Sequence, residues 1–120
     1  MNTKEKGFDG IALYNIEMDG CLNGVYTDIE ANGVIFNEIN RKKKYSEAKS
    51  SDIIGDYDSL SFDRISKKSK RNKYCRGSLK ITKYNKAYSF KWINSHDVPE
   101  YEGIGYKMNT TQIAVTYWTV

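Results

Sequence analysis

The sequence contains one histidine, one proline and two cysteines, and this scarcity excludes several kinds of site. A structural zinc ion needs four Cys or His ligands, whereas Cys21 and Cys75 stand far apart and His96 is alone in a polar turn. No phosphate-loop or Gly-x-Gly-x-x-Gly spacing occurs, and no Ser/His/Asp or Cys/His arrangement for nucleophilic catalysis can be assembled. We therefore expect no metal, no cofactor and no enzymatic activity.

Long apolar runs are missing as well. The chain begins Met-Asn-Thr-Lys-Glu-Lys without the apolar core of a secretion signal, and no stretch approaches the length of a membrane span. These features predict a cytoplasmic protein in which both cysteines are thiols. A disulfide is the alternative if a signal peptide had been lost from the chain.

Aromatic residues, by contrast, are abundant, at 13% of 120 residues, and ten of them are tyrosine. Rings bury large areas each, so a small domain can be filled by few of them. This composition is unlike that of a disordered chain, and the length suits one domain spanning 1–120.

The last third of the chain alternates aromatic or aliphatic residues with polar ones at a period of two, as in Tyr88-Ser-Phe90-Lys-Trp92. Such alternation is typical of a strand with one buried face. Asp19-Gly20 and Asn32-Gly33 are hairpin signals, and short polar turns separate the other segments. Strands are predicted at 11–18, 20–28, 33–41, 52–63, 74–83, 86–93, 100–107 and 112–119.

Eight short consecutive strands without intervening helices predict an all-β fold, an antiparallel up-and-down meander closed into a small barrel. Closure removes the exposed sheet edges that an open meander would leave. The segments 42–51 and 64–73 are the two long polar connections, and the sequence leaves their role open.

Charge is strongly polarised along the chain. Residues 1–40 carry a net charge of −5, whereas residues 64–86 carry +10 and no acid. A basic segment with tyrosines nearby can bind a polyanion, so nucleic acid is one alternative partner. The candidate polyanion-binding residues are Lys67, Lys68, Lys70, Arg71 and Lys73.

Several short motifs, in order, resemble the avidin–streptavidin family of small ligand-binding barrels. They are Leu13-Tyr14-Asn15, Leu22-Asn-Gly24-Val-Tyr26, Ile54-Gly55-Asp-Tyr57-Asp-Ser59, Tyr88-Ser-Phe-Lys-Trp92, Tyr101-Glu-Gly103 and Tyr117-Trp118.

The resemblance implies a ligand in the open end of the barrel, held among tryptophans and polar groups. Carried over by position, the candidate ligand-binding residues are Asn15, Tyr26, Tyr57, Trp92 and Trp118. The chain departs from the family pattern where Asp19 and Asp28 replace hydroxyl residues.

The leading hypothesis is a non-catalytic recognition barrel. It would bind a small molecule in the barrel mouth or an acidic protein partner on its surface, and the rings could instead fill the barrel and leave no cavity. The apolar, aromatic strand 114–120 at the end of the chain also suggests a homo-oligomer.

Overall fold

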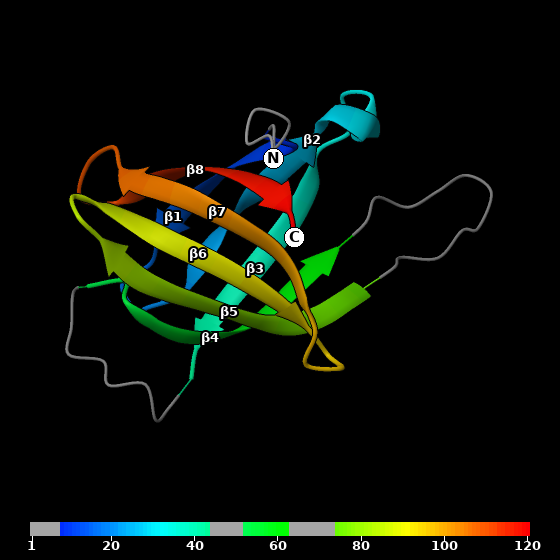
Figure 1. Ribbon diagram of the computed structural model, residues 1–120. Helices are drawn as coiled ribbons and strands as arrows, with labels where there is room; N and C mark the ends of the chain where they lie inside the picture. Colours follow the sequence, from blue (N-terminus) through cyan, green and yellow to red (C-terminus); the bar gives the residue numbers. More distant parts are fainter. Residues whose placement is uncertain (1–7, 44–51, 63–73) are drawn as a thin grey trace.

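The computed structural model describes residues 8–43, 52–62 and 74–120, which form a closed barrel of eight antiparallel strands (Figure 1). Each strand pairs with the next, and β1 pairs with β8 to close the barrel. The predicted meander barrel is confirmed, and its architecture is consistent with calycin-type barrels. The strands are β1 (Gly10–Ile16), β2 (Leu22–Asp28), β3 (Phe36–Lys42), β4 (Gly55–Phe62), β5 (Tyr74–Tyr84), β6 (Ala87–Asn94), β7 (Pro99–Lys107) and β8 (Gln112–Thr119).

The connections follow the local turn chemistry only in part. Asp19-Gly20 makes the predicted tight turn: the Asp19 carboxylate accepts from the backbone N–H of Cys21, and Gly20 has a φ of 91°. Asn32-Gly33 does not form a two-residue hairpin, because a 3-10 helix at Ile29–Ala31 precedes it. Of the two long connections predicted at 42–51 and 64–73, residues 44–51 and the whole of 64–73 lie outside the described residues.

Alternation along the strands places the apolar set inside the barrel. In β8, Ile113, Val115 and Tyr117 are buried, and in β6 Tyr88 and Phe90 are buried. A side chain on one strand faces the same side as its paired neighbour, so these residues form continuous layers across the barrel. The interior therefore follows directly from the period-two pattern.

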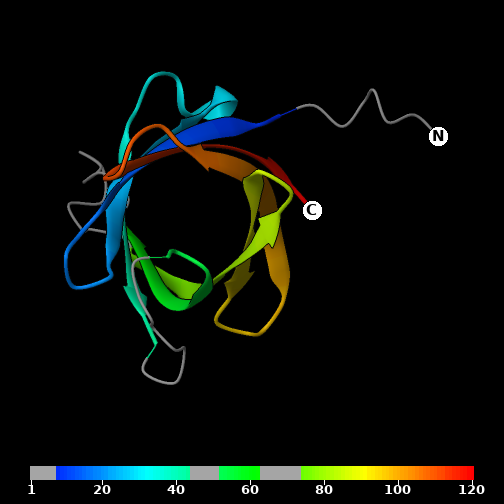
Figure 2. The ribbon, with the colours of Figure 1, turned by 90° about the vertical axis from the view of Figure 1, so that its left-hand side faces the viewer.

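Figure 2 looks along the barrel from the end at which the chain enters β4, and the segment before β4 packs into this end. Ile53 precedes β4 and is 1% exposed, so its side chain lies among the core residues. The Tyr57 hydroxyl donates to the Ile53 carbonyl at 2.7 Å, and the Lys42 ammonium donates to the Asp52 carbonyl at 2.9 Å. These bonds hold residues 52–54 across this end and leave the opposite end as the mouth.

In strand β3 the usual pattern is reversed: polar side chains face the barrel interior, and an isoleucine faces outward. Its polar residues Glu38 and Asn40 are buried, whereas Ile39 is 37% exposed on the outer surface. Burial of a carboxyl group costs free energy unless hydrogen bonds compensate it. This arrangement brings an ionisable group into an otherwise largely apolar interior.

Candidate ligand-binding cavity at the barrel mouth

A cavity of about 370 Å³ occupies the mouth half of the barrel. It lies on the inward faces near the end of β2, the start of β3 and the end of β4, and it continues to the adjoining parts of β5 to β8. Its volume falls in the range of small-molecule sites. Six aromatic rings line it: Tyr14, Tyr26, Phe36, Trp92, Tyr101 and Tyr117.

The rings pack around Tyr117. Its ring centroid lies 5.8 Å from Trp92, 5.7 Å from Tyr101 and 6.3 Å from Tyr26, each in an edge-on arrangement. The Tyr117 hydroxyl donates to the Thr27 carbonyl at 3.2 Å. Edge-to-face packing favours such ring pairs beyond their burial, so the wall is held together by its own contacts.

Glu38 contributes a carboxylate to the cavity and is only 6% exposed. Its Oε2 accepts from the Tyr14 hydroxyl at 2.9 Å, from Asn40 Nδ2 at 2.9 Å and from the Trp92 indole at 3.0 Å. Three donors on one oxygen orient the carboxyl group rigidly. Among the residues that the structure describes, no Lys or Arg forms an ion pair with it.

Burial raises the pKa of Glu38 above its usual value of 4.5, and the hydrogen bonds from Trp92, Asn40, Tyr14 and Ser59 oppose that rise. Burial raises the pKa of Tyr14 as well, and the neighbouring Glu38 charge adds to the effect. Tyr14 therefore stays a hydroxyl donor. The ionised form of Glu38 is thus stabilised by neutral hydrogen-bond donors, without a cationic partner among the described residues.

Because the pKa of Glu38 is raised, the free energy of unfolding should depend on pH, and Glu38→Gln should make that pH dependence weaker. Because the folded state binds the Glu38 proton more tightly than the unfolded chain does, this group's contribution to stability is lost as pH rises from about 4.5 through the folded pKa. At neutral pH the variant should therefore be more stable than the parent, by about 1 kcal/mol. Urea unfolding of both proteins between acidic and neutral pH measures the difference.

The other charged groups that line the cavity, Asp28, Glu100 and Arg76, are present in both proteins and cancel in this comparison. A stability difference that stays the same at every pH would contradict the assignment, because it would mean that Glu38 does not titrate differently on folding.

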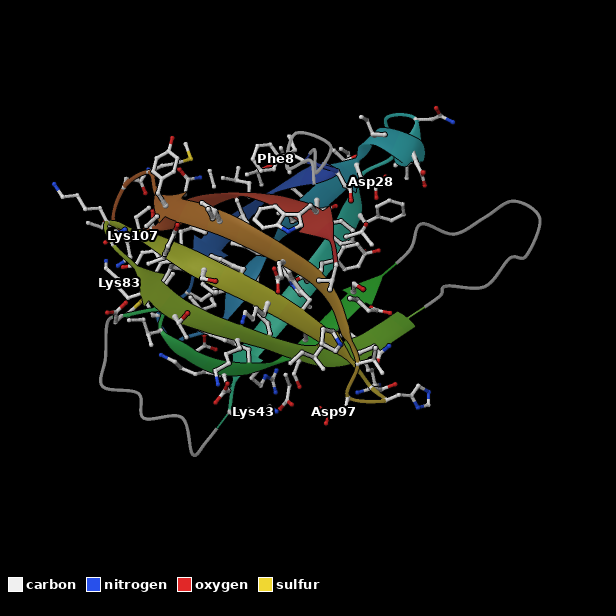
Figure 3. The ribbon with its side chains drawn as sticks, viewed as in Figure 1. Phe8, Asp28, Lys43, Lys83, Asp97 and Lys107 are labelled. Carbon is white, nitrogen blue, oxygen red and sulfur yellow. The ribbon has the colours of Figure 1, made fainter. Side chains whose placement is uncertain are left out.

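The rim of the cavity is polar. Asp28 ends β2, and Figure 3 places it at the end of the barrel opposite Lys83 and Lys107. Glu100 accepts from Asn94 Nδ2 at 3.2 Å, and both residues line the cavity. Three carboxylates therefore line the cavity, counting Glu38.

Arg76 is the one basic residue among the lining residues that the structure describes, and it is exposed. It precedes Gly77 and Leu79 on β5, of which Leu79 is fully buried. Alternation therefore directs the Arg76 side chain outward.

Two of the five candidate ligand-binding residues, Tyr26 and Trp92, line the cavity. The other three do not. Tyr57 points inward but is 1% exposed at the closed end, where its hydroxyl is bonded to Ile53.

The predictions for Asn15 and Trp118 need correction, because strand alternation turns both side chains out of the barrel. Asn15 is exposed beside the inward Tyr14. Trp118 follows the inward Tyr117, and its ring centroid lies 5.6 Å from that of Phe8 on the outer surface.

The candidate polyanion-binding residues Lys67, Lys68, Lys70, Arg71 and Lys73 lie outside the described residues. Elsewhere in the basic segment, Lys80, Lys83 and Lys86 are exposed. Lys83 lies over the Tyr88 ring, with its ammonium 4.3 Å from the ring centroid.

Sequence reasoning missed Glu38, which is the central polar group of the cavity. A signal existed: in β3 the polar set Glu38, Asn40 and Lys42 shares the face of Phe36, whereas Ile39 lies on the other face. A strand whose more polar face is turned inward indicates a polar group in the barrel interior. Recognising this signal requires knowing which face of β3 points into the barrel, and that follows only from the pairing of β3 with β2 and β4.

Other candidate groups do not assemble into a site. Within residues 8–43, 52–62 and 74–120, no three His, Cys, Asp or Glu side chains could hold a metal ion. His96 is exposed in the turn before β7, and Cys21 is a buried free thiol. None of the helical segments in the described part of the chain is long and apolar enough to cross a membrane.

Comparison with known proteins does not extend this description. No family model matches the chain, and no curated protein or solved structure matches it.

Proposed function

We propose that this chain is a non-catalytic binding barrel that takes a small molecule in its mouth. The observation that carries the proposal is a cavity with a buried, hydrogen-bonded carboxylate in a ring of aromatic side chains. Burying that charge costs stability that a purely structural barrel could avoid with an apolar residue at the same position. Polar groups retained in an apolar pocket are characteristic of ligand-binding sites.

The barrel architecture and the ring-lined mouth also support an avidin-like mode of binding, with Tyr26 and Trp92 as ligand contacts. The support does not extend to Asn15 and Trp118, which lie on the outer surface. The polar contact to the ligand is assigned instead to Glu38.

Filling the cavity should abolish ligand binding without unfolding the barrel. Ser61 lines the mouth on β4, and in Ser61→Phe a ring would take the place of a small hydroxyl group. We expect native mass spectrometry of the purified parent protein to show a mass above a multiple of 13.8 kDa that is lost on denaturation. The same measurement on Ser61→Phe should show the bare multiple.

Thr82→Phe is the matched control, because Thr82 is exposed on β5 and does not line the cavity. It should retain the added mass. A ligand retained equally by Ser61→Phe and Thr82→Phe would place the binding site outside the mouth.

Self-association is a second proposal, supported by the outer surface of β1, β2 and β7. Ile11 is 61% exposed, Tyr106 is 58% exposed, and Leu13 and Val25 are each 39% exposed in directly paired positions. Contiguous apolar side chains on the outside of a barrel favour contact with another protein surface. An acidic partner or nucleic acid at the basic segment 64–86 stays a prediction from the sequence.

A further inference from the structure

We propose that the cavity selects a small aromatic or aliphatic molecule carrying a positive charge, such as a protonated amine. The proposal rests on the proposed function and specifies its ligand class. It follows from the residues that line the cavity: the buried Glu38 carboxyl group and six aromatic rings.

The first step is the charge of Glu38. Its Oε2 accepts three hydrogen bonds from neutral donors, from Tyr14, Asn40 and Trp92, and these orient the group without neutralising it. Oε1 takes part in none of these three bonds. Ser59 also donates to the carboxyl group. None of the four donors carries a charge, so an ionised Glu38 still attracts an ammonium group in the cavity.

The second step is the aromatic wall. A cation over the face of a Trp or Tyr ring is attracted by the ring quadrupole, and the attraction grows when water is excluded. Trp92 both lines the cavity and donates its indole N–H to Glu38 at 3.0 Å. The carboxylate and the rings therefore present one combined surface to a ligand.

The third step is the balance of charge among the lining residues. Among the charged lining residues of the described chain, Glu38 is buried and Asp28 is half-buried, whereas Glu100 and Arg76 are both exposed at the rim. An anionic ligand would meet the buried Glu38 carboxyl group, while the one basic lining residue of the described chain, Arg76, is exposed and directed outward. Like charges in a desolvated site are strongly unfavourable, which disfavours anionic ligands.

The ligand class can be tested with three probes of nearly the same shape: phenethylamine, 2-phenylethanol and 3-phenylpropanoate. At neutral pH they are a cation, a neutral molecule and an anion. Isothermal titration should give phenethylamine an affinity at least about tenfold higher than that of the alcohol, and no measurable binding of the acid.

The charge on Glu38 is tested with Glu38→Gln, which keeps the size of the side chain and an acceptor for Tyr14 and Trp92. Its affinity for phenethylamine should fall at least about tenfold, while its affinity for the alcohol changes little. Glu102→Gln on β7 is the matched control, since Glu102 does not line the cavity, and it should leave both affinities unchanged.

If Glu38→Gln fails to fold, Asp28→Asn at the rim provides a second variant, with a loss for the cation alone. Equal or tighter binding of the alcohol or the acid to the parent protein would overturn the cation proposal and leave the small-molecule proposal standing. Failure of all three probes to bind, together with a bare native mass, would overturn both.

Discussion

Phe90→Ala is expected to lower the free energy of unfolding by about 4 kcal/mol, the largest loss from a single substitution that this structure predicts. The Phe90 side chain is 0% exposed. Its ring centroid lies 6.3 Å from that of Tyr14 and 5.6 Å from that of Trp92. Phe90 therefore packs against two of the residues that donate hydrogen bonds to Glu38. Removing the ring leaves a cavity that the surrounding strands, paired on both sides, cannot close. Equilibrium unfolding in urea measures the loss.

The neighbours of Phe90 provide the controls. Lys91→Ala, at the next and exposed position of β6, should change stability by less than about 0.5 kcal/mol. Phe90→Leu retains most of the buried volume and should cost about 1.5 kcal/mol or less. A Phe90→Ala loss below about 2 kcal/mol would show that the barrel interior collapses around the missing ring, contrary to the packing described.

Gly24→Ala is expected to destabilise the protein by about 3 kcal/mol, although it adds one methyl group. Gly24 in β2 pairs with Tyr14 in β1, where the two strands approach closely. A Cβ at Gly24 would fall on the carbonyl oxygen of Leu13 and lie 2.8 Å from Cα of Tyr14. Both atoms belong to the backbone, so the strands themselves would have to separate. Thermal unfolding should show a Tm lower by about 10 °C.

The sign of this effect distinguishes the close approach from ordinary glycine flexibility. The φ of Gly24 is not in the left-handed region, so without the contact with Leu13 the alanine would stabilise the protein by about 0.4–1 kcal/mol through the unfolded chain. Val25→Ala, at the partly exposed neighbouring position, should cost about 1 kcal/mol or less. A stabilised Gly24→Ala variant would contradict the tight pairing of β1 and β2.

The strands were predictable because each is a local pattern. Tyr88-Ser-Phe90 and Val115-Thr-Tyr117 alternate so clearly that period two alone identifies their buried faces, and the structure buries Tyr88, Phe90, Val115 and Tyr117. Turn residues separated the strands, and wherever a short turn joins two neighbours only antiparallel pairing is possible. The barrel followed because eight such strands bury their edges by closing.

The site was predictable only in part. A residue lines the cavity only if its side chain points into the barrel and if it lies near the mouth along the barrel axis. Tyr26 and Trp92 satisfy both conditions. Trp118 fails the first because Tyr117, one residue earlier, takes the inward position. Tyr57 fails the second because Ile53 folds over it at the closed end, through a contact that local sequence does not encode.

By itself, the sequence determined the strand pattern, the order of the strands and the abundance of rings available for an interior. These properties depend on neighbours one or two positions away along the chain. Only the tertiary structure decided that Glu38 is buried, that Tyr14 and Trp92 donate to it, and which end of the barrel is open. Those outcomes depend on which strands face one another across the barrel, a relation between residues 24 and 54 positions apart. The cavity is therefore a property of barrel closure, and its chemistry is set by the polar residues that β3 and β4 turn inward.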